Sequence, residues 1–245
     1  MPAEAATTDP AAGRPLGPDR VVVVTGAASG LGAAVAAAAA ARGAQVVGID
    51  RRACAIDGVH PIEADLADRS SATAAVEHCL ATFGGIDALV TCAGIDVPGG
   101  FLDVEPDDWD RVVAVNLFGT AWVVRAALAS LLDRRGRVVT VASTLGHRAV
   151  CDATAYCASK WGVVGFTRAL AAEVKGRVGV TLLTPGGMRT AFFDGRDAQY
   201  APGPDTPLGD PHDVARAVLF ALEQGDTTAV WELVVAGPHE GSWPP

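Results

Sequence analysis

The chain is poor in lysine and tyrosine. Its 245 residues contain two tyrosines, Tyr156 and Tyr200, and two lysines, Lys160 and Lys175, against seventeen arginines. A chain that uses arginine for almost every cation nevertheless places one lysine four residues after one tyrosine. Lysine carries a compact ammonium with a tunable pKa, whereas arginine is a planar fork that stays charged. The rarity of both residue types therefore directs attention to Tyr156 and Lys160.

Other absences exclude several classes of protein. The cations are scattered with no basic run and the formal net charge is −9, so nucleic acid and anionic membranes are poor partners. The five cysteines are odd in number and include no Cys-x-x-Cys pair, which favours reduced thiols over disulfides or a metal site. The N-terminal residues carry acids and no apolar stretch, unlike a signal peptide, so we expect a cytoplasmic protein.

Length and composition predict one folded domain. With half of its 245 residues hydrophobic, the chain can bury a single α/β core. Residues 1–18 are Ala, Pro, Thr, Gly and charges without periodicity, so we expect a disordered lead before a domain over 19–245. The rest alternates strand and helix patterns, which predicts a doubly wound parallel sheet of about seven strands. Strands are expected near 21–25, 45–50, 59–62, 86–91, 137–142, 178–184 and 230–235, and helices near 30–42, 68–83, 107–133, 154–174 and 211–224.

One predicted helix is apolar nearly all round. The segment 112–132 nevertheless contains Asn116, Gly119 and Arg125. A membrane span tolerates an amide and a guanidinium badly. We therefore expect a helix buried by the sheet on one side and by a partner subunit on the other.

Tyr156 and Lys160 lie four residues apart in the predicted helix 154–174. That spacing brings both side chains to one helix face. A neighbouring cation favours the phenolate and lowers the pKa of a tyrosine from its ordinary value of about 10. Such a tyrosine can exchange a proton with an alcohol or a carbonyl near neutral pH. Taken alone, the pair is equally compatible with two exposed polar residues on an amphipathic helix.

A glycine-rich turn follows the first predicted strand. Four valines and Thr25 lead into Gly26, Gly30 and Gly32, and an alanine-rich run follows to Arg42. Such a turn lets backbone N–H groups at a helix N-terminus approach a pyrophosphate. The spacing Gly-x-x-x-Gly-x-Gly differs from the commonest dinucleotide fingerprint. A tight turn without a ligand is the alternative.

The second predicted strand ends in Asp50. An acid at this point can accept hydrogen bonds from an adenosine ribose and repels a 2′-phosphate, which favours NAD over NADP. Arg51 and Arg52 follow directly and could serve a phosphate instead. NADP therefore stays the second choice of cofactor.

Together these motifs resemble the short-chain dehydrogenase/reductase family across most of the chain. The turn at 25–32 is similar to the family's cofactor motif, and Ser143 lies thirteen residues before Tyr156, as the catalytic serine of the family does. Asn116 corresponds to the family's fourth catalytic position. The resemblance implies a Rossmann-type domain, a hydride transfer between NAD(P) and a secondary alcohol or ketone, and a homodimer or homotetramer.

The resemblance also implies a task for each catalytic residue. Tyr156 would be the general acid in ketone reduction and the general base in alcohol oxidation. Lys160 would lower the pKa of that tyrosine and hold the nicotinamide ribose. Ser143 would hydrogen-bond the substrate oxygen, and Asn116 would position a water that relays protons. The residues expected at the dinucleotide are Thr25, Gly26, Ser29, Gly30, Leu31, Gly32, Asp50, Arg51, Asp65, Leu66, Cys92, Ala93, Gly94, Tyr156, Lys160, Pro185, Gly186, Met188 and Thr190.

Two positions depart from the family pattern. Cys92 stands where the family usually has an asparagine that braces the central sheet. The C-terminal segment 236–245 lacks the usual Gly-Gly ending, which forms part of the family's standard interface.

The substrate is expected over the carboxyl ends of the strands. There the sequence has Ile95, Asp96, Leu145, Val150 and the segment 187–210, which is rich in Gly, Pro and aromatic residues and resembles a mobile lid. These residues define the substrate no further than a secondary alcohol or ketone.

Two other functions are compatible with parts of the sequence. His147 lies four residues after Ser143 and invites a serine-hydrolase interpretation, but no Gly-x-Ser-x-Gly elbow surrounds that serine. A dinucleotide-binding sensor or scaffold without turnover would share the fold. The complete set of four catalytic residues favours an enzyme.

Overall fold

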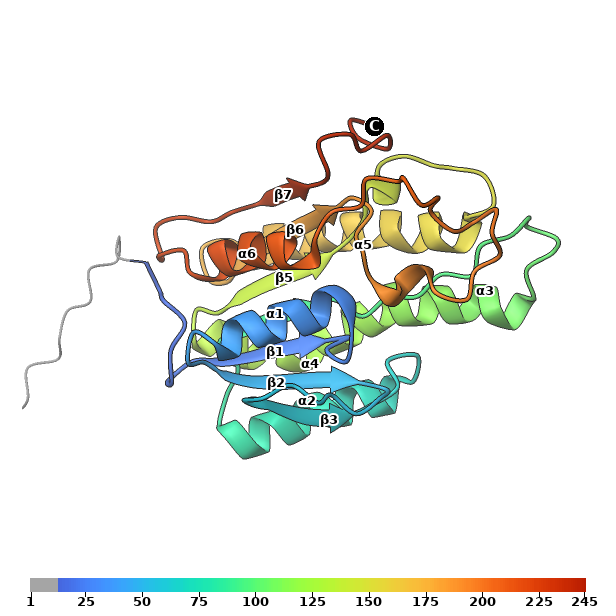
Figure 1. Ribbon diagram of the computed structural model, residues 1–245. Helices are drawn as coiled ribbons and strands as arrows, with labels where there is room; N and C mark the ends of the chain where they lie inside the picture. Colours follow the sequence, from blue (N-terminus) through green and yellow to red (C-terminus); the bar gives the residue numbers. More distant parts are fainter. Residues whose placement is uncertain (1–12) are drawn as a thin grey trace, which may run out of the picture.

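A parallel sheet of seven strands forms the centre of the molecule (Figure 1). The structure is a computed structural model and describes residues 13–245, so the start of the predicted N-terminal lead lies outside the described residues. The strand order is β3-β2-β1-β4-β5-β6-β7, with the chain crossing over between β3 and β4. This order confirms the predicted doubly wound fold. The strands are β1 Val21–Thr25, β2 Gln45–Asp50, β3 Val59–Glu63, β4 Ala88–Thr91, β5 Arg137–Val141, β6 Gly179–Pro185 and β7 Glu232–Val235.

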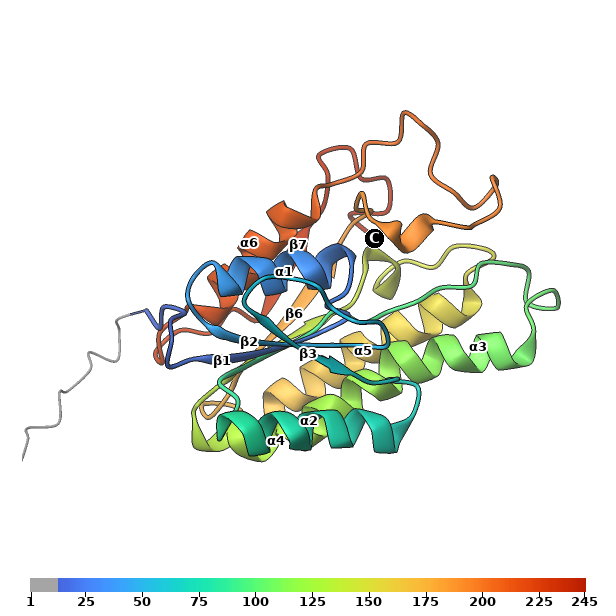
Figure 2. The ribbon, with the colours of Figure 1, turned by 60° about the horizontal axis from the view of Figure 1, so that its bottom comes forward.

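Helices cover both faces of the sheet. Helices α1 and α6 lie on one face, whereas α2, α4 and α5 lie on the other (Figure 2). Their bounds agree with the predicted helices to within two residues at almost every end. They are α1 Gly30–Ala40, α2 Arg69–Phe83, α3 Pro106–Val113, α4 Thr120–Asp133, α5 Thr154–Glu173 and α6 Pro211–Leu222, with short helical turns η1 Ala114–Gly119, η2 Thr144–Gly146 and η3 Ala191–Phe193.

The four valines of β1 explain why this strand lies in the middle of the sheet. Side chains alternate between the two faces of a strand. Val22 and Val24 therefore enter the core beneath α1 and α6, and Val21 and Val23 enter the core beneath α2 and α4. All four are at most 2% exposed. A strand buried on both faces is typical of a parallel sheet covered by helices on each side.

The predicted helix 107–133 is interrupted by a π-helical turn. α3 and α4 are separated by η1, which carries Asn116. π-helical turns are often found at functional sites. By length and composition alone Pro106–Asp133 could cross a membrane, with a mean hydropathy of 1.7 in its most apolar window. In the structure this stretch packs against α2 and α5.

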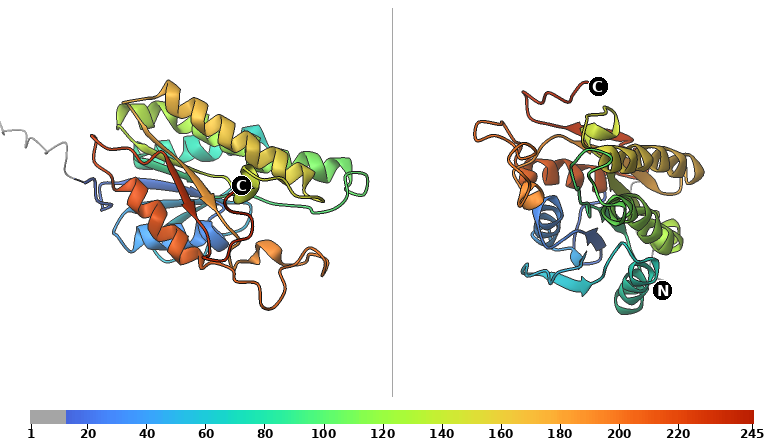
Figure 3. Two further views of the ribbon diagram at one scale, coloured as in Figure 1. Left: turned by 90° about the horizontal axis from the view of Figure 1, so that it is seen from above. Right: turned by 90° about the vertical axis from the view of Figure 1, so that its right-hand side faces the viewer.

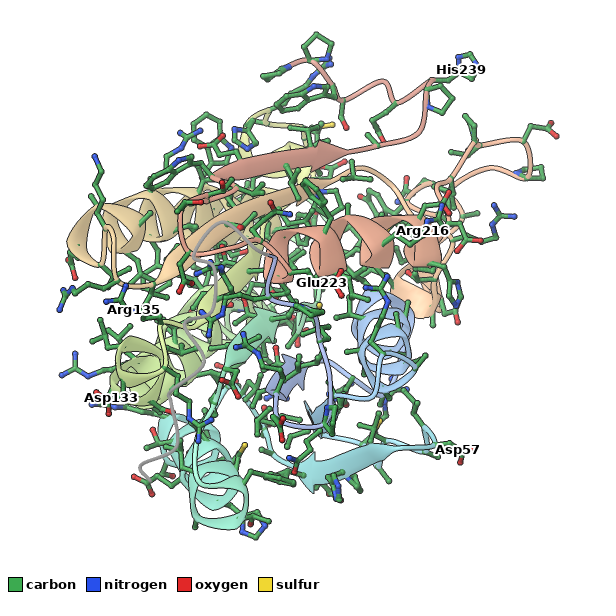
Figure 4. All side chains as sticks on the ribbon, turned by 90° about the vertical axis from the view of Figure 1, so that its left-hand side faces the viewer. Asp57, Asp133, Arg135, Arg216, Glu223 and His239 are labelled. Atoms are coloured by element: carbon green, nitrogen blue, oxygen red, sulfur yellow. The ribbon has the colours of Figure 1, made fainter. Side chains whose placement is uncertain are left out.

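The N-terminal segment packs onto the domain before the predicted boundary at residue 19. Leu16 is 6% exposed and belongs to the core beneath α1 and α6. The N–H of Arg14 donates to the carbonyl oxygen of Glu223 at 2.8 Å, and its guanidinium pairs with Asp226 at 3.1 Å. Figure 4 looks onto this edge of the molecule and labels Glu223 at the end of α6. The folded part therefore includes residues of the segment that the sequence assigned to the lead.

The carboxyl ends of the strands meet at one edge of the sheet, because all pairings are parallel. Two segments extend over this edge: the connection from β6 to α6 and the chain after β7 (Figure 3). The first is the predicted lid, 187–210. Its two ends are joined, because the N–H of Gly209 donates to Gly187 and the N–H of Arg189 donates to Gly209, both at 2.9 Å. The predicted lid is thus a loop whose two ends are held together.

Candidate active site

A cavity of about 600 Å³ lies at the carboxyl edge of the sheet, a size typical of small-molecule sites. Every residue expected at the dinucleotide lines it except Thr25. Ser143 and Tyr156 also line it, so one space joins the predicted cofactor and catalytic groups. Its lining includes Gly26, Ser29, Gly30, Leu31, Gly32, Asp50, Arg51, Asp65, Leu66, Cys92, Ala93, Gly94, Lys160, Pro185, Gly186, Met188 and Thr190.

The glycine-rich turn needs each of its three glycines. Gly26 and Gly30 have φ values of 69° and 56°, which favour glycine. A Cβ on Gly32 would lie 2.1 Å from the carbonyl oxygen of Gly26, so only glycine lets α1 begin so close to β1. The N-cap residue Ser29 makes no side-chain cap. The first N–H groups of α1 therefore stay available to a ligand beside the turn.

Asp50 faces the glycine-rich turn from the end of β2. Its carboxylate accepts the N–H of Ala28 and the N–H of Arg52, both at 3.0 Å. A carboxylate has about four acceptor positions, so these two bonds leave capacity for the hydroxyls of a ribose. Arg52 also reaches across the turn and donates from Nη2 to Ser29 Oγ at 3.0 Å. Of the two neighbouring arginines, Arg52 is the one bound to the turn.

Asp65 and Leu66 form the far end of the cavity. Asp65 accepts the N–H of Ala67 at 2.9 Å and pairs with Arg111 of α3, also at 2.9 Å. The hydrogen bond from Ala67 and the guanidinium of Arg111 hold the pKa of Asp65 below its usual range. Leu66 is buried. Arg111 lines the cavity too, and no sequence pattern indicated it because α3 lies far from Asp65 along the chain.

Thr25 does not line the cavity, but its side chain holds Ala93, which does. Its hydroxyl accepts the N–H of Ala93 at 3.1 Å, which ties the end of β1 to the end of β4. Cys92, the departure from the family's asparagine, packs against the core beneath α1 and α6. Burial raises the pKa of the Cys92 thiol to about 12, so it stays a neutral thiol. The bond from Thr25 braces the sheet at this level.

Tyr156 and Lys160 share one face of α5, as their spacing predicts. The ammonium of Lys160 lies 5.7 Å from the centre of the Tyr156 ring. It donates to the carbonyl oxygen of Val141 at 2.9 Å. Lys160 is only 4% exposed, and burial lowers its pKa to about 8. The ammonium is therefore more acidic than an ordinary lysine and is anchored at the end of β5.

The pKa of Tyr156 corrects the expectation drawn from the sequence. Burial raises it to about 12, although a hydrogen bond with Ser143 and the charge of Arg196 act to lower it. The sequence predicted a lowered pKa because of Lys160. In the structure the loss of hydration outweighs the neighbouring charges, and the Lys160 ammonium is directed at Val141. The phenol is thus protonated at neutral pH in the protein alone.

Ser143 lies two residues after β5, opposite Tyr156. Its backbone is extended and its hydroxyl accepts the N–H of Leu145 at 3.1 Å, which begins the turn η2. The Ser143 hydroxyl also acts to lower the pKa of Tyr156, which reflects how close the two side chains lie. Two hydroxyl groups from different elements therefore line one cavity and can both bond one substrate oxygen.

Asn116 does not line the cavity. Its side-chain oxygen accepts the N–H of Ile95 at 2.8 Å, and its amide donates to the carbonyl of Ile95 at 2.9 Å and to Ser159 at 3.0 Å. The residue is fully buried. Asn116 therefore holds the end of β4 against α5 behind Gly94. The predicted role in positioning a water stays a prediction.

The chain after β7 forms part of the site, although no motif in the sequence predicted this. Glu240 and Ser242 line the cavity. Glu240 accepts the N–H of Gly187 at 2.8 Å, and the Ser242 hydroxyl bonds that of Thr144 at 2.7 Å. This segment (Figure 3) thus joins the base of the lid to the turn after Ser143.

The ring of His147 contacts Thr184 and Trp243. Its Nε2 lies 3.1 Å from Thr184 Oγ1, and its ring packs edge-on against Trp243 at 5.5 Å. Burial lowers the pKa of His147, so it is neutral at neutral pH. This arrangement gives the serine-hydrolase interpretation no support.

The segment 187–210 contributes aromatic rings beside the Tyr156 phenol. The Phe192 ring lies 5.7 Å from that of Tyr156 and 5.4 Å from that of Phe193. Of the residues expected near the substrate, Ile95, Asp96 and Leu145 line the cavity. Val150 does not line it and is 43% exposed.

Comparison with known proteins identifies the family. Residues 20–201 match the short chain dehydrogenase family. The chain belongs to this family. Its members are oxidoreductases that use nicotinamide cofactors, which agrees with the cavity and with the fold.

Three relatives of this short-chain dehydrogenase show how widely the similarity extends. An uncharacterised oxidoreductase of Staphylococcus aureus is 33% identical over 228 residues, which cover 89% of this chain and 96% of that protein. A D-threitol dehydrogenase of Mycolicibacterium smegmatis is 36% identical over 220 residues, covering 82% and 85%. The structure of a 3-ketoacyl-(acyl-carrier-protein) reductase from Brucella melitensis, complexed with NADH, has a TM-score of 0.80 and 29% identity, covering 90% and 98%.

Proposed function

We propose that this protein transfers a hydride between NAD(H) and a secondary alcohol or ketone, with Tyr156 as the general acid and base. One observation supports the proposal most directly. The Tyr156 phenol lines the same cavity as Ser143, Lys160 and the glycine-rich turn, and Ser143 lies close enough to act on its pKa. A proton donor and a hydroxyl that can stabilise a substrate oxygen thus share one space with the proposed dinucleotide site.

The raised pKa of Tyr156 suits ketone reduction. The phenol is protonated at neutral pH and can give its proton to the substrate oxygen as negative charge develops there. Ser143 donates a second hydrogen bond to the same oxygen. In alcohol oxidation the phenolate accepts the proton, which requires positive charge that lowers the Tyr156 pKa. Arg196 already acts in that direction, and Lys160 and an oxidised nicotinamide would add to it. The bound dinucleotide supplies or accepts the hydride.

The residues of the cavity fit a dinucleotide. The turn at 26–32 leaves no room for a Cβ on Gly32 and presents backbone N–H groups, as a pyrophosphate requires. Asp50, Asp65 and Leu66 would hold the adenosine, and Lys160 and Thr190 would hold the nicotinamide half. Asn116 is a positioning residue in this proposal, because it acts through Ile95 and Ser159.

NAD is the proposed cofactor. Asp50 can accept bonds from both ribose hydroxyls and repels a 2′-phosphate. Arg52 is the residue that favours the alternative, NADP, because its guanidinium already spans the turn. The related reductase complexed with NADH supports the first choice.

The substrate class follows from the same chemistry. Relatives are named for D-threitol and for a 3-ketoacyl group, both of which present a secondary alcohol or a ketone. A secondary alcohol/ketone pair is therefore the proposed substrate class. It is a small molecule, and nucleic acid and membranes are not proposed partners.

A homodimer or homotetramer in the cytoplasm completes the proposal. Phe118 and Trp161 are 48% and 52% exposed on η1 and α5, in the helix layer that the sequence predicts to meet a partner subunit. Large exposed aromatic side chains are typical of protein interfaces.

A turnover screen tests this function against the sensor alternative. Purified protein with NAD or NADP would be assayed by nicotinamide absorbance against a panel of ketones and secondary alcohols. Turnover of at least one pair is expected. Tight dinucleotide binding with no turnover of any compound would favour a sensor or scaffold instead.

A further inference from the structure

An ion pair between Asp96 and Arg196 closes the lid side of the cavity. Asp96 lies after β4 and Arg196 lies in the lid, so the two come from segments a hundred residues apart. Arg196 Nη2 lies 3.1 Å from Asp96 Oδ2, and the two side chains are 12% and 6% exposed. Both residues line the cavity. A salt bridge this deeply buried on the wall of a cavity is unusual and calls for a physical reason.

Several polar atoms of this pair form no hydrogen bond with the described residues. Asp96 Oδ1 and the Nε and Nη2 atoms of Arg196 are buried and have no hydrogen-bond partner among the described residues. The 3.1 Å contact therefore brings the charges together without an aligned hydrogen bond. Buried polar groups without partners destabilise a protein, and nearly all such groups in native proteins are satisfied. A ligand in the cavity can supply the missing partners.

The Phe192 ring connects the Asp96–Arg196 pair with the Tyr156 phenol. The Arg196 guanidinium stacks on Phe192 and Phe193 at 4.7 and 4.8 Å from the ring centres. Phe192 also lies beside Tyr156, with the two ring centres 5.7 Å apart. The charges of Asp96 and Arg196 shift the Tyr156 pKa in opposite directions, which also reflects their proximity. A substrate bound at Tyr156 thus extends toward Asp96 and Arg196.

The chemistry of the two side chains selects one kind of polar group. Asp96 offers an acceptor and Arg196 offers donors, and the net charge of the pair is zero. A hydroxyl group donates and accepts at once, so it can bond both residues. A carboxylate in the same position is repelled by Asp96, and an ammonium is repelled by Arg196. Phe192 and Phe193 provide an apolar wall for the carbon chain.

We propose that the Asp96–Arg196 pair binds hydroxyl groups of the substrate away from the reacting carbon, and that the substrate is a neutral polyol or its keto form. The inference rests on the proposed function and adds the substrate class. Because Arg196 belongs to the lid, the complete polar site exists only when the lid lies against Asp96.

Matched alcohols test the preference for additional hydroxyl groups. Xylitol and secondary pentanol share a carbon chain but differ in the hydroxyls beyond the reacting one. With NAD, kcat/KM for xylitol should exceed that for secondary pentanol by about tenfold or more, since a hydrogen bond to a charged group strengthens binding by that order. Sorbitol, gluconate and glucamine differ at one terminal group, which is a hydroxyl, a carboxylate or an ammonium. Sorbitol should be preferred over both charged compounds.

Variants of the pair should change the charge preference in opposite directions. Asp96→Asn leaves the guanidinium and should raise the gluconate-to-sorbitol ratio of kcat/KM. Arg196→Met keeps the apolar contact with the phenylalanines and should raise the glucamine-to-sorbitol ratio. Both variants should lose most of the preference for xylitol over secondary pentanol. If the pair were purely structural, both variants would lower kcat/KM for all substrates by the same factor and would leave these ratios unchanged.

A second ion pair provides the matched control. Asp213 and Arg216, the latter labelled in Figure 4, lie 2.7 Å apart on α6 with 59% and 70% of their side chains exposed. Asp213→Asn and Arg216→Met should leave every substrate ratio as in the wild type. NAD titration and thermal unfolding of all four variants check that the Asp96 and Arg196 variants remain folded and still bind the cofactor.

Binding measurements separate this inference from the proposed function. In the Tyr156→Phe variant with NAD bound, ligand-observed NMR titration compares xylitol with secondary pentanol without turnover. Tighter xylitol binding that is lost on Asp96→Asn supports the pair's role, even if no compound is turned over and the proposed function fails. Equal or weaker xylitol binding, or ratios that neither variant changes, overturns the inference while leaving the oxidoreductase proposal intact.

Discussion

The ammonium of Lys160 donates a hydrogen bond to the carbonyl oxygen of Val141 at 2.9 Å, so a buried cation is fixed at the end of the strand that delivers Ser143. The backbone of η2, directly after Ser143, packs on the same residue, because a Cβ on Gly146 would lie 3.0 Å from the Lys160 carbonyl oxygen. Helix α5 and strand β5 are thereby held in the relative position that brings Tyr156 to Ser143.

Replacement of Lys160 by Met should weaken dinucleotide binding and move the pH inflection of alcohol oxidation upward. The variant removes the positive charge that favours the Tyr156 phenolate. Because the pKa of Lys160 is about 8, its charge is present below that pH and lost above it, so the difference in affinity should shrink as pH rises through about 8. Cofactor titrations across pH and initial rates measure both effects.

Lys160→Arg serves as the control. It keeps the charge but changes its shape and reach, so it should restore the Met variant only in part. An unchanged pH profile and unchanged cofactor affinity in Lys160→Met would remove Lys160 from the mechanism.

Much of this arrangement could be predicted from the sequence. The four valines of β1, the three glycines after them and the Tyr156–Lys160 spacing are local patterns, and each led to the correct element. The fold followed from the alternation of such elements, because parallel strands joined by helices have few possible topologies.

Contacts between distant segments could not be predicted. Asp96 and Arg196, or Glu240 and Gly187, meet only because the lid and the chain after β7 both turn over the carboxyl edge of the sheet. The periodic patterns of a sequence do not show which distant segments come into contact. The Tyr156 pKa was predicted in the wrong direction for a similar reason: the burial of the phenol depends on the folded shape, whereas the Lys160 spacing is visible in the sequence.

The two tyrosines of the chain allow a direct titration of Tyr156. In a Tyr200→Phe protein, the tyrosinate absorbance reports Tyr156 alone. Without a dinucleotide, burial holds the Tyr156 pKa at about 12, so no tyrosinate should form near neutral pH. Addition of NAD brings a cationic ring into the cavity and should lower the pH at which tyrosinate appears. Tyrosinate near neutral pH in the free protein would mean that Lys160 outweighs burial.

Asp50 and Arg52 should have opposite effects on cofactor choice. We expect NAD(H) to bind at least about tenfold more tightly than NADP(H), because a charged hydrogen bond is lost and a repulsion gained with the 2′-phosphate. Asp50→Ala should reduce that ratio, and Arg52→Ala should weaken NADP(H) alone. Calorimetric titration of both cofactors measures the ratio. Tighter NADP(H) binding by the wild type would show that Arg52 dominates.

Glu240→Ala should loosen the chain after β7 and weaken substrate binding. The carboxylate accepts bonds from Gly187 at 2.8 Å and from Ser242 at 3.1 Å, so we expect the free energy of unfolding to fall by about 1–3 kcal/mol. Glu232→Ala, which breaks an exposed pair with Arg168, is the control and should change it by less than about 1 kcal/mol. Urea denaturation and KM measure the two effects. Equal losses in both variants would contradict the special role of Glu240.

The same carboxylate predicts a pH dependence of stability. Burial acts to raise the pKa of Glu240, but the hydrogen bonds from Ser242 and Gly187 outweigh it and hold the pKa below its usual range. The ionised group therefore contributes stability that is present above the ordinary glutamate pKa and is lost as pH falls through the lowered value. The difference in unfolding free energy between the wild type and Glu240→Ala should shrink over that acidic range. A constant difference would mean that the carboxylate's charge is irrelevant.

Tyr156→Phe tests the central claim most directly, because it removes one oxygen atom from the proposed proton donor and keeps the ring that contacts Phe192. With the best alcohol from the screen, kcat should fall by roughly 10²–10⁴-fold or more, while NAD affinity, measured by calorimetry, should stay close to that of the wild type. Tyr200→Phe, the only other such change available in the chain, should leave kcat unchanged. A Tyr156→Phe enzyme that turns over at the wild-type rate would contradict the proposed mechanism.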